Sequence, residues 1–107
     1  MIIYNVTLRV PYNLEREWLA WMPDHIAAVL GTGCFSQAIF TKILADHEED
    51  ATAYSVQYLA PSQEDLETYY DQHAERLRNE GLARWGENIL AFRTELQVVD
   101  QYVANSN

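Results

Sequence analysis

The sequence is poor in the residues that several classes of protein require. Cys34 is the only cysteine among 107 residues, which allows no internal disulfide and no cysteine-based zinc site. Lys42 is the only lysine, and 16 acidic against 7 basic residues give a net charge of −9. Such a field repels nucleic-acid phosphates and anionic lipid heads, so we expect neither nucleic acid nor a membrane as a partner.

Long hydrophobic runs are also lacking. No run approaches the roughly 20 apolar residues that span a bilayer. Met1 is followed at once by the strand-like segment IIYNVTLRV, without the basic region and apolar core of a signal peptide. We therefore expect a cytoplasmic protein.

Hydrophobic residues, in contrast, are plentiful. They make up 49% of the chain, and the aromatics include seven tyrosines. This composition excludes a disordered chain and is typical of one small domain with a single core. We expect the domain to cover residues 1–103 and to leave a frayed tail at 104–107.

Hydrophobic periodicity predicts the secondary structure. Alternation of side chains predicts strands at 2–10, 35–44, 53–60 and 89–99. Helical spacing predicts one helix over 13–30 and a second from Ser62 to Gly81, with Ser62 as its N-cap and Asp65 as the capping partner. Pro23 lies inside the first helix, which should kink or restart there.

The element order βαββαβ predicts a ferredoxin-like α+β fold. Right-handed crossovers place both helices on one face of a four-stranded antiparallel sheet with strand order 4-1-3-2. We expect the more apolar side of each strand to face the helices. The other side would then form an open face, with polar residues at Asn5, Thr7, Arg9, Ser55, Gln57, Arg93, Glu95 and Gln97.

This expected open face mixes polar and apolar side chains, because Ile3, Leu59 and Ala91 share it. A fully hydrated face of a small domain usually carries more Lys and Glu. We therefore expect a homodimer whose sheets face each other around a shared, hydrated interior.

Several segments together resemble a small bacterial family of unassigned function within the dimeric α/β-barrel superfamily. They are MIIYNVTLRV, EWLAWMPDHIAAVLGTGCF, TAYSVQYLA and ILAFRTELQVV. The resemblance covers nearly the whole chain, and Pro23 departs from it where an ordinary helix former is expected. It implies the fold and the dimer. The wider superfamily includes cofactor-free monooxygenases, haem-degrading enzymes, lactone isomerases and ligand binders, so the fold does not choose an activity.

Two groups of residues are candidates for a ligand site. On the first helix, Trp18 and Met22 belong to the expected core. Trp21 lies about 100° from Met22 around the helix axis and could border a pocket. His25 is either a functional proton carrier or haem ligand, or a partly buried structural histidine. His73 is expected in the core and His47 in a solvated acidic turn, so we expect no metal site.

The second group lies on the expected open face. Arg93 either pairs with Glu95 to set the dimer register or joins Arg9 to flank a carboxylate or enolate. Asn5, Thr7 and Gln57 complete the candidate lining. The favoured interpretation is a homodimer that binds a small molecule or partner in the barrel interior, without a cofactor. The alternatives are a cofactor-independent oxygenase or isomerase using His25, Arg93 and Gln57, and a haem-binding or haem-degrading protein.

Overall fold

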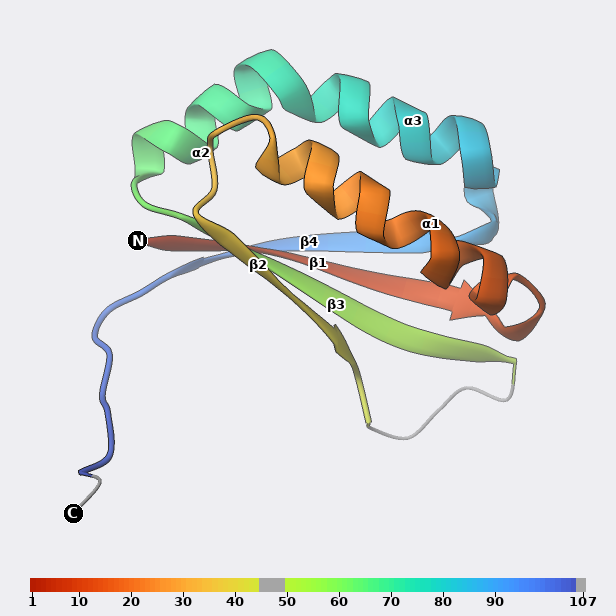
Figure 1. Ribbon diagram of the computed structural model, residues 1–107, viewed down its shortest axis with the longest axis horizontal. Coiled ribbons are helices and arrows are strands. Elements are labelled where there is room, and N and C mark those ends of the chain that lie inside the picture. The colour runs from red at the N-terminus through yellow and green to blue at the C-terminus, as the bar shows by residue number, and fades with distance from the viewer. Residues whose placement is uncertain (45–49, 106–107) are drawn as a thin grey trace.

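The computed structural model describes residues 1–44 and 50–105, and the predicted turn residue His47 lies outside them. One sheet and two long helical segments make up this part of the chain (Figure 1). The elements are β1 (Ile2–Pro11), α1 (Tyr12–Leu30), β2 (Gln37–Lys42), β3 (Ala51–Ala60), α2 (Gln63–Tyr69), a π-helical turn (Tyr70–Ala74), α3 (Glu75–Trp85), a 3-10 turn (Gly86–Asn88) and β4 (Leu90–Gln97).

The sheet is antiparallel, with strand order β2-β3-β1-β4. Both helical segments lie on one of its faces and leave the other uncovered (Figure 1). The predicted ferredoxin-like fold and strand order are therefore confirmed. The two central strands pair along their full length, from Ile2 opposite Ala60 to Pro11 opposite Ala51.

The core lies between the two layers. Side chains from one side of β1 and β3 meet the buried residues of the helices there, and the largest fully buried ones are Trp18, Leu66, Leu77, Val10, Val29 and Val56. Within this core an aromatic cluster forms around Tyr4, whose ring lies 5.7–6.2 Å from those of Phe35, Tyr58, Tyr69 and Tyr70. Alternation predicted the inward residues of β1 and β3 among them, such as Tyr4, Val10 and Val56.

The second helical segment differs from its prediction in the middle and at its end. Ser62 caps it as predicted, since its hydroxyl accepts a hydrogen bond from the Asp65 amide at 3.1 Å. The π-helical turn then separates the buried residues Tyr69 and Ala74 by five positions. Helical spacing of 3.6 residues cannot foresee such a shift. The helix also passes through Gly81 and ends at Trp85, with Gly86 as its cap, so the predicted end at Gly81 is wrong.

Pro23 neither interrupts α1 nor restarts it, because the helix is continuous from Tyr12 to Leu30. Pro23 removes one backbone donor, which leaves the carbonyl of Leu19 without its helical partner. Both Pro23 and Leu19 are exposed, so water can hydrate that carbonyl. The predicted restart is wrong, since exposure lets the helix tolerate the proline.

The largest correction concerns β4. It pairs with β1 so that Arg93 lies opposite Val6 and Glu95 opposite Tyr4, and paired residues share a face of the sheet. Arg93 and Glu95 therefore face the helices. Leu90, Phe92 and Leu96 face the other way and are exposed, Phe92 to 60%. Because side chains alternate, choosing the wrong inward side inverted every residue of this strand.

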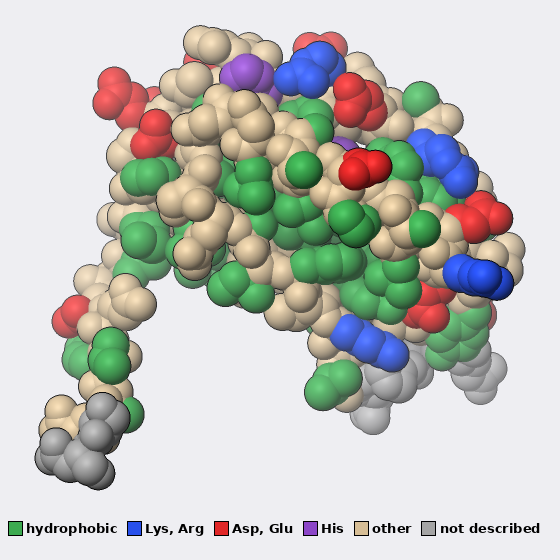
Figure 2. Space-filling view, viewed as in Figure 1, with side chains coloured by type: hydrophobic (Ala, Val, Ile, Leu, Met, Phe, Trp, Pro, Cys, Tyr) green, Lys and Arg blue, Asp and Glu red, His purple; other side chains and the backbone are tan. Residues whose placement is uncertain are grey.

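Beyond β4 the chain runs away from the body of the protein (Figure 1). The amide of Val98 still donates to the carbonyl of Met1 at 3.0 Å, which extends the ladder by one bond. The following residues up to 105 form no helix or strand. Their apolar side chains are almost fully exposed, at 97% for Val99 and 87% for Tyr102, and appear as separate green groups in Figure 2.

Candidate functional site

The sheet divides the predicted site residues into two groups. The register of β1 and β3 places Asn5, Thr7, Arg9 and Gln57 on the open face, as predicted. In contrast, Arg93 and Glu95 lie on the helix-facing side with the residues of α1. The expected arrangement of Arg93 beside Arg9 is therefore wrong, because the sheet lies between their side chains.

The polar residues of the open face are largely engaged with one another. Ser55 donates to the side-chain oxygen of Asn5 at 2.6 Å, and the Asn5 amide donates to the Thr7 hydroxyl at 3.1 Å. At the end of β1, Arg9 forms an ion pair with Asp50 at 2.9 Å. These contacts engage three of the four open-face candidates for binding a ligand, Asn5, Thr7 and Arg9. Around them lie exposed apolar residues, including Ile39, Leu90 and Phe92.

A cavity of about 120 Å³ lies on the other side of the sheet, beneath the helices. We call it the inner cavity. Its floor is formed by Tyr4, Val6 and Leu8 of β1 with Val56 and Tyr58 of β3 and Ala91 and Arg93 of β4. Its walls come from α1, with Trp18, Trp21, Met22, His25 and Val29, and from α3 and its end, with Leu77, Arg78, Gly81, Leu82 and Trp85. The cavity explains why Val6 and Leu8 are only half-buried although they point toward the helices.

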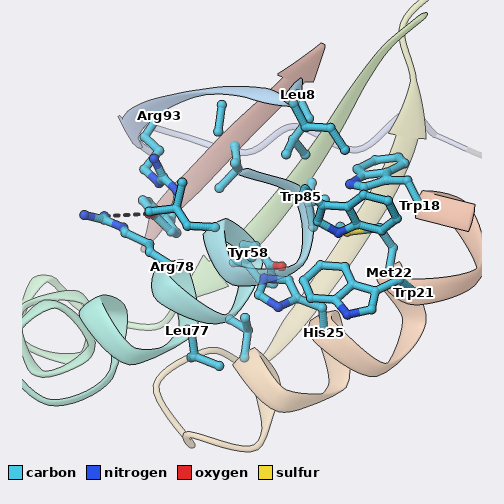
Figure 3. Close-up of a pocket in the computed structure, with 18 of the residues that line it drawn as sticks. Leu8, Trp18, Trp21, Met22, His25, Tyr58, Leu77, Arg78, Trp85 and Arg93 are labelled. Carbon is cyan, nitrogen blue, oxygen red and sulfur yellow. Dashed lines mark hydrogen bonds between the residues drawn. The ribbon is translucent and has the colours of Figure 1, made fainter. Parts of the chain in front are cut away.

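Figure 3 shows how polar and apolar groups divide this cavity. The two arginines lie on one side, and the three tryptophans lie on the other. Trp21 meets Trp85 edge to face, with ring centroids 6.0 Å apart. The cavity therefore has an aromatic part and a cationic part within one enclosure.

His25 lies at the aromatic side, with its ring stacked on that of Trp21 at 4.6 Å. Burial lowers the pKa of His25, and the charge of Arg93 lowers it further, while Glu80 acts in the opposite direction. The imidazole is therefore neutral at pH 7, where it offers one nitrogen as an acceptor. His25 and Arg93 do face the same cavity, as the enzyme interpretation requires, whereas Gln57 lies on the opposite side of the sheet.

Arg78 is held in place by the aromatic cluster. One of its terminal nitrogens donates to the Tyr4 hydroxyl at 3.0 Å, and its guanidinium lies 5.8 Å from the centre of the Tyr70 ring. Burial raises the pKa of Tyr70 to about 12, and the negative charge of Glu95 adds to the effect. Glu95 does not form an ion pair with Arg93 among the described residues.

Three buried side-chain nitrogens in the described part of the chain have no hydrogen-bond partner. They are Nδ1 of His25, Nε of Arg78 and Nε1 of Trp85. All three residues line the inner cavity. A buried polar group without a partner costs about 1–3 kcal/mol, so native structures contain few of them. These unpartnered nitrogens are therefore concentrated around one cavity.

The sequence identified Trp21, His25 and Arg93 but missed Arg78 and Trp85. Helical spacing from Leu77 places Arg78 beside the inward stripe, yet nothing in the sequence shows that an arginine there faces a cavity. Trp85 lies beyond the predicted end of the helix at Gly81, whereas in the structure it is the last residue of α3.

The described residues show neither a metal-binding cluster nor a membrane-spanning helix. The described residues contain no group of three or more His, Cys, Asp or Glu side chains placed to hold a metal ion. His73 is half-buried and lies 3.5 Å from Arg76, outside the inner cavity. Among the same residues, no helix has the length and apolar character needed to cross a bilayer.

Solved structures with the same fold have little sequence in common with this chain. A candidate antibiotic biosynthesis monooxygenase from Deinococcus radiodurans matches with a TM-score of 0.65 and 10% identity, covering 99% of this chain and 100% of that one. A dimeric ferredoxin-like protein from an uncultured marine organism matches with a TM-score of 0.60 and 13% identity, covering 97% and 100%. A designed protein, Foldit4, matches with a TM-score of 0.60 and 10% identity, covering 91% and 97%. These likenesses establish the fold alone.

A comparison with curated proteins finds no match. Family models are more informative, because one of them, described as a domain of unknown function (DUF4286), matches residues 1–99. The match spans the sheet, both helical segments and every residue of the inner cavity. The resemblance to a family of unassigned function is thereby confirmed, and the chain belongs to the DUF4286 family.

Proposed function

We propose that this protein binds a small molecule in the inner cavity and works as a homodimer joined through its open sheet faces. The observation that carries the binding proposal is the set of three unpartnered buried nitrogens around one cavity. Burying those groups is costly, and a ligand that accepts or donates hydrogen bonds there offsets the cost. The proposal moves the expected site from the interface between two sheets to the interior of each protomer.

The cavity volume limits the size of the ligand. A dry cavity of about 150 Å³ in another protein binds benzene, and the inner cavity has about 120 Å³. This size supports a ligand with one ring and speaks against haem, whose macrocycle is much larger. The haem alternative further predicts that a Soret band appears when haem is added. Absence of that band would exclude haem binding.

The dimer rests on the open face. Leu90, Phe92 and Ile39 are exposed there, next to polar groups that already satisfy each other, and a second copy would cover all of them. A face with few free charges suits an isologous interface. One solved structure of the same fold is described as dimeric, which supports the proposal by analogy.

A second candidate function is favoured by one observation. His25, neutral at pH 7, and Arg93 line the same cavity, which is the minimum that proton abstraction with stabilisation of the resulting anion requires. A fold-mate described as a candidate monooxygenase agrees with an enzyme but does not specify one. Binding remains the better-supported function because it requires only the cavity and the unpartnered nitrogens around it, and no reactive group.

Filling the cavity tests the binding proposal. Ala91 lies on the floor of the inner cavity, so Ala91→Phe should occupy the space without removing any polar group. Single-ring compounds that raise the melting temperature of the wild type should then have no effect on the variant. Ala83→Phe, on the exposed side of α3, is the matched control and should bind as the wild type does. Equal responses of Ala91→Phe and wild type would overturn the proposal.

A further inference from the structure

The inner cavity also restricts the chemistry of its ligand. Arg78 from α3 and Arg93 from β4 line it together, although the protein as a whole carries a net charge of −9. Neither arginine forms an ion pair with any described residue, whereas Arg9, Arg76 and Arg84 each have a carboxylate partner. Arginines without counter-ions at the edge of an apolar cavity have the charge and the donors to hold an anion.

The acidic groups nearest this pair are engaged elsewhere. Glu95, on the same side of β4, lies close enough to Tyr70 to raise the pKa of its hydroxyl. Glu80 lies 3.8 Å from Arg76 on the surface of the helix. Neither carboxylate therefore neutralises the arginines as a salt bridge would. The free Nε of Arg78, which is buried, provides one donor, and the side chain is already oriented by its bond to the Tyr4 hydroxyl.

The remainder of the cavity favours a flat apolar group. Trp21 and His25 form a stacked pair, and Trp85 stands edge-on to Trp21, so planar rings enclose this side. Flat ligands gain contact with such walls that puckered rings of the same volume do not. Trp85 Nε1 and His25 Nδ1, both unpartnered, add polar positions at the aromatic end.

We propose that the inner cavity takes a small aromatic carboxylate, with its carboxylate between Arg78 and Arg93 and its ring among Trp21, His25 and Trp85. This inference rests on the proposed binding function and names its ligand class. The carboxylate accepts hydrogen bonds from both guanidinium groups, and its charge-assisted bonds replace those it made with water. The ring displaces water from the apolar walls. The aromatic end sets the shape of the ligand, and the arginines set its charge.

Three probes of one size separate charge from shape: benzoate, its neutral analogue benzamide and the non-planar cyclohexanecarboxylate. Tryptophan fluorescence reports directly, because the three tryptophans of the chain all line the cavity, and calorimetry supplies the dissociation constants. We expect benzoate to bind at least about tenfold more tightly than benzamide, the size of one charge-assisted hydrogen bond. Cyclohexanecarboxylate should also bind more weakly than benzoate.

Variants assign the charge preference to a residue. Arg93→Gln should reduce the benzoate-to-benzamide ratio about tenfold, because benzoate loses an ion-paired hydrogen bond whereas neutral benzamide loses a weaker one. Arg93 is exposed and has no hydrogen bond to the described residues, so its replacement leaves the fold intact, which circular dichroism verifies. Arg16→Gln, an exposed arginine of α1 outside the cavity, is the control and should keep the full ratio.

The outcomes distinguish this inference from the function on which it rests. Equal binding of benzoate and benzamide would overturn the anion class and leave small-molecule binding intact. Equal binding of the two carboxylates would overturn the preference for a flat ring. If none of the probes changes fluorescence or heat at millimolar concentration, the proposed binding function itself is wrong. An unchanged ratio in Arg93→Gln would remove Arg93 from the anion site.

Discussion

His25 links a single buried ring to the pH dependence of the whole protein. Its pKa is lowered in the folded state, chiefly by burial, relative to an ordinary value of 6.5. The unfolded chain therefore takes up a proton at a higher pH than the folded protein does. The stability that the neutral His25 contributes is fully present above about pH 6.5. It is lost as the pH falls below that value, because protonation of His25 favours the unfolded state.

Replacing His25 with Gln should remove this part of the pH dependence. Glutamine keeps a polar side chain in place and cannot be protonated in this range. We expect the free energy of unfolding of the wild type to fall more between pH 7 and pH 5 than that of His25→Gln, measured by urea denaturation at each pH. Parallel curves for the two proteins would show that His25 does not lose stability by protonation.

The buried tyrosines act at the opposite end of the pH scale. Burial raises the pKa of Tyr69 to about 12, and its neighbour Tyr4 adds to the effect. Burial likewise raises the pKa of Tyr58. In each case the unfolded state loses its proton first, near pH 10, so stability decreases as the pH rises beyond that value. The aromatic cluster around Tyr4 is thus a structural unit that excludes charge from its interior, and Arg78 meets it at the Tyr4 hydroxyl and over the Tyr70 ring.

At the scale of the element, the second helical segment determines the shape of the cavity. Its π-helical turn changes which residues of the following helix face the sheet, and α3 then carries Arg78, Gly81 and Trp85 to the cavity wall. Single π-turns are found frequently at functional sites because they rotate side chains without breaking a helix. The helix ends at Trp85, and its cap Gly86 has a φ of 62° and a ψ of −142°, which other residues rarely adopt.

Two glycines of this segment provide a matched pair of substitutions. Gly86→Ala should destabilise the protein by about 1–3 kcal/mol, because a side chain is strained in that backbone conformation. Gly81→Ala should stabilise it by about 0.5–1 kcal/mol, since Gly81 is helical and an added Cβ would lie 3.9 Å from Trp21, in ordinary contact. Chemical denaturation of both variants measures the difference. The opposite order would contradict this account of where the helix ends.

At the scale of the whole molecule, one face of the sheet exposes apolar residues that nothing in a single protomer covers. In the described part of the chain, apolar residues of β2 and β4 are exposed on it, and the segment after β4 adds Val99, Tyr102 and Val103 in extended chain. Burial of such surface is worth roughly 25 cal/mol per Å², so association should be favourable. The inner cavity lies on the other side of the sheet, and a dimer through the open face would leave it intact.

A charge placed on the open face should prevent the dimer. Phe92 is 60% exposed at the edge of this face, and Phe92→Glu would bring two carboxylates into a symmetric interface. Analytical ultracentrifugation at micromolar concentration should give twice the chain mass for the wild type and a single-chain mass for the variant. Leu19→Glu adds the same charge to exposed α1, on the helical side, and should remain dimeric. A monomeric wild type would refute the dimer outright.

Sequence reasoning predicted the fold better than the site, for identifiable reasons. The fold follows from local patterns, such as the alternation of Ile2, Tyr4 and Val10 and the cap formed by Ser62. On β4 these patterns misled, since its apolar side chains face away from the helices and Arg93 faces toward them. The assumption that apolar residues face a protein's own core fails on β4. There an arginine faces the inner cavity, and the apolar residues lie on the sheet face that no helix covers.

The amino-acid sequence by itself determined the order of strands and helices, the antiparallel sheet and the residues at the centre of the core. Each of these depends on periodicity and caps, which act between residues close in the chain. Only the tertiary structure decided that His25, Arg78, Trp85 and Arg93 surround one cavity. Their meeting depends on the register of β4 against β1 and on a π-turn, and both are set by packing between distant segments.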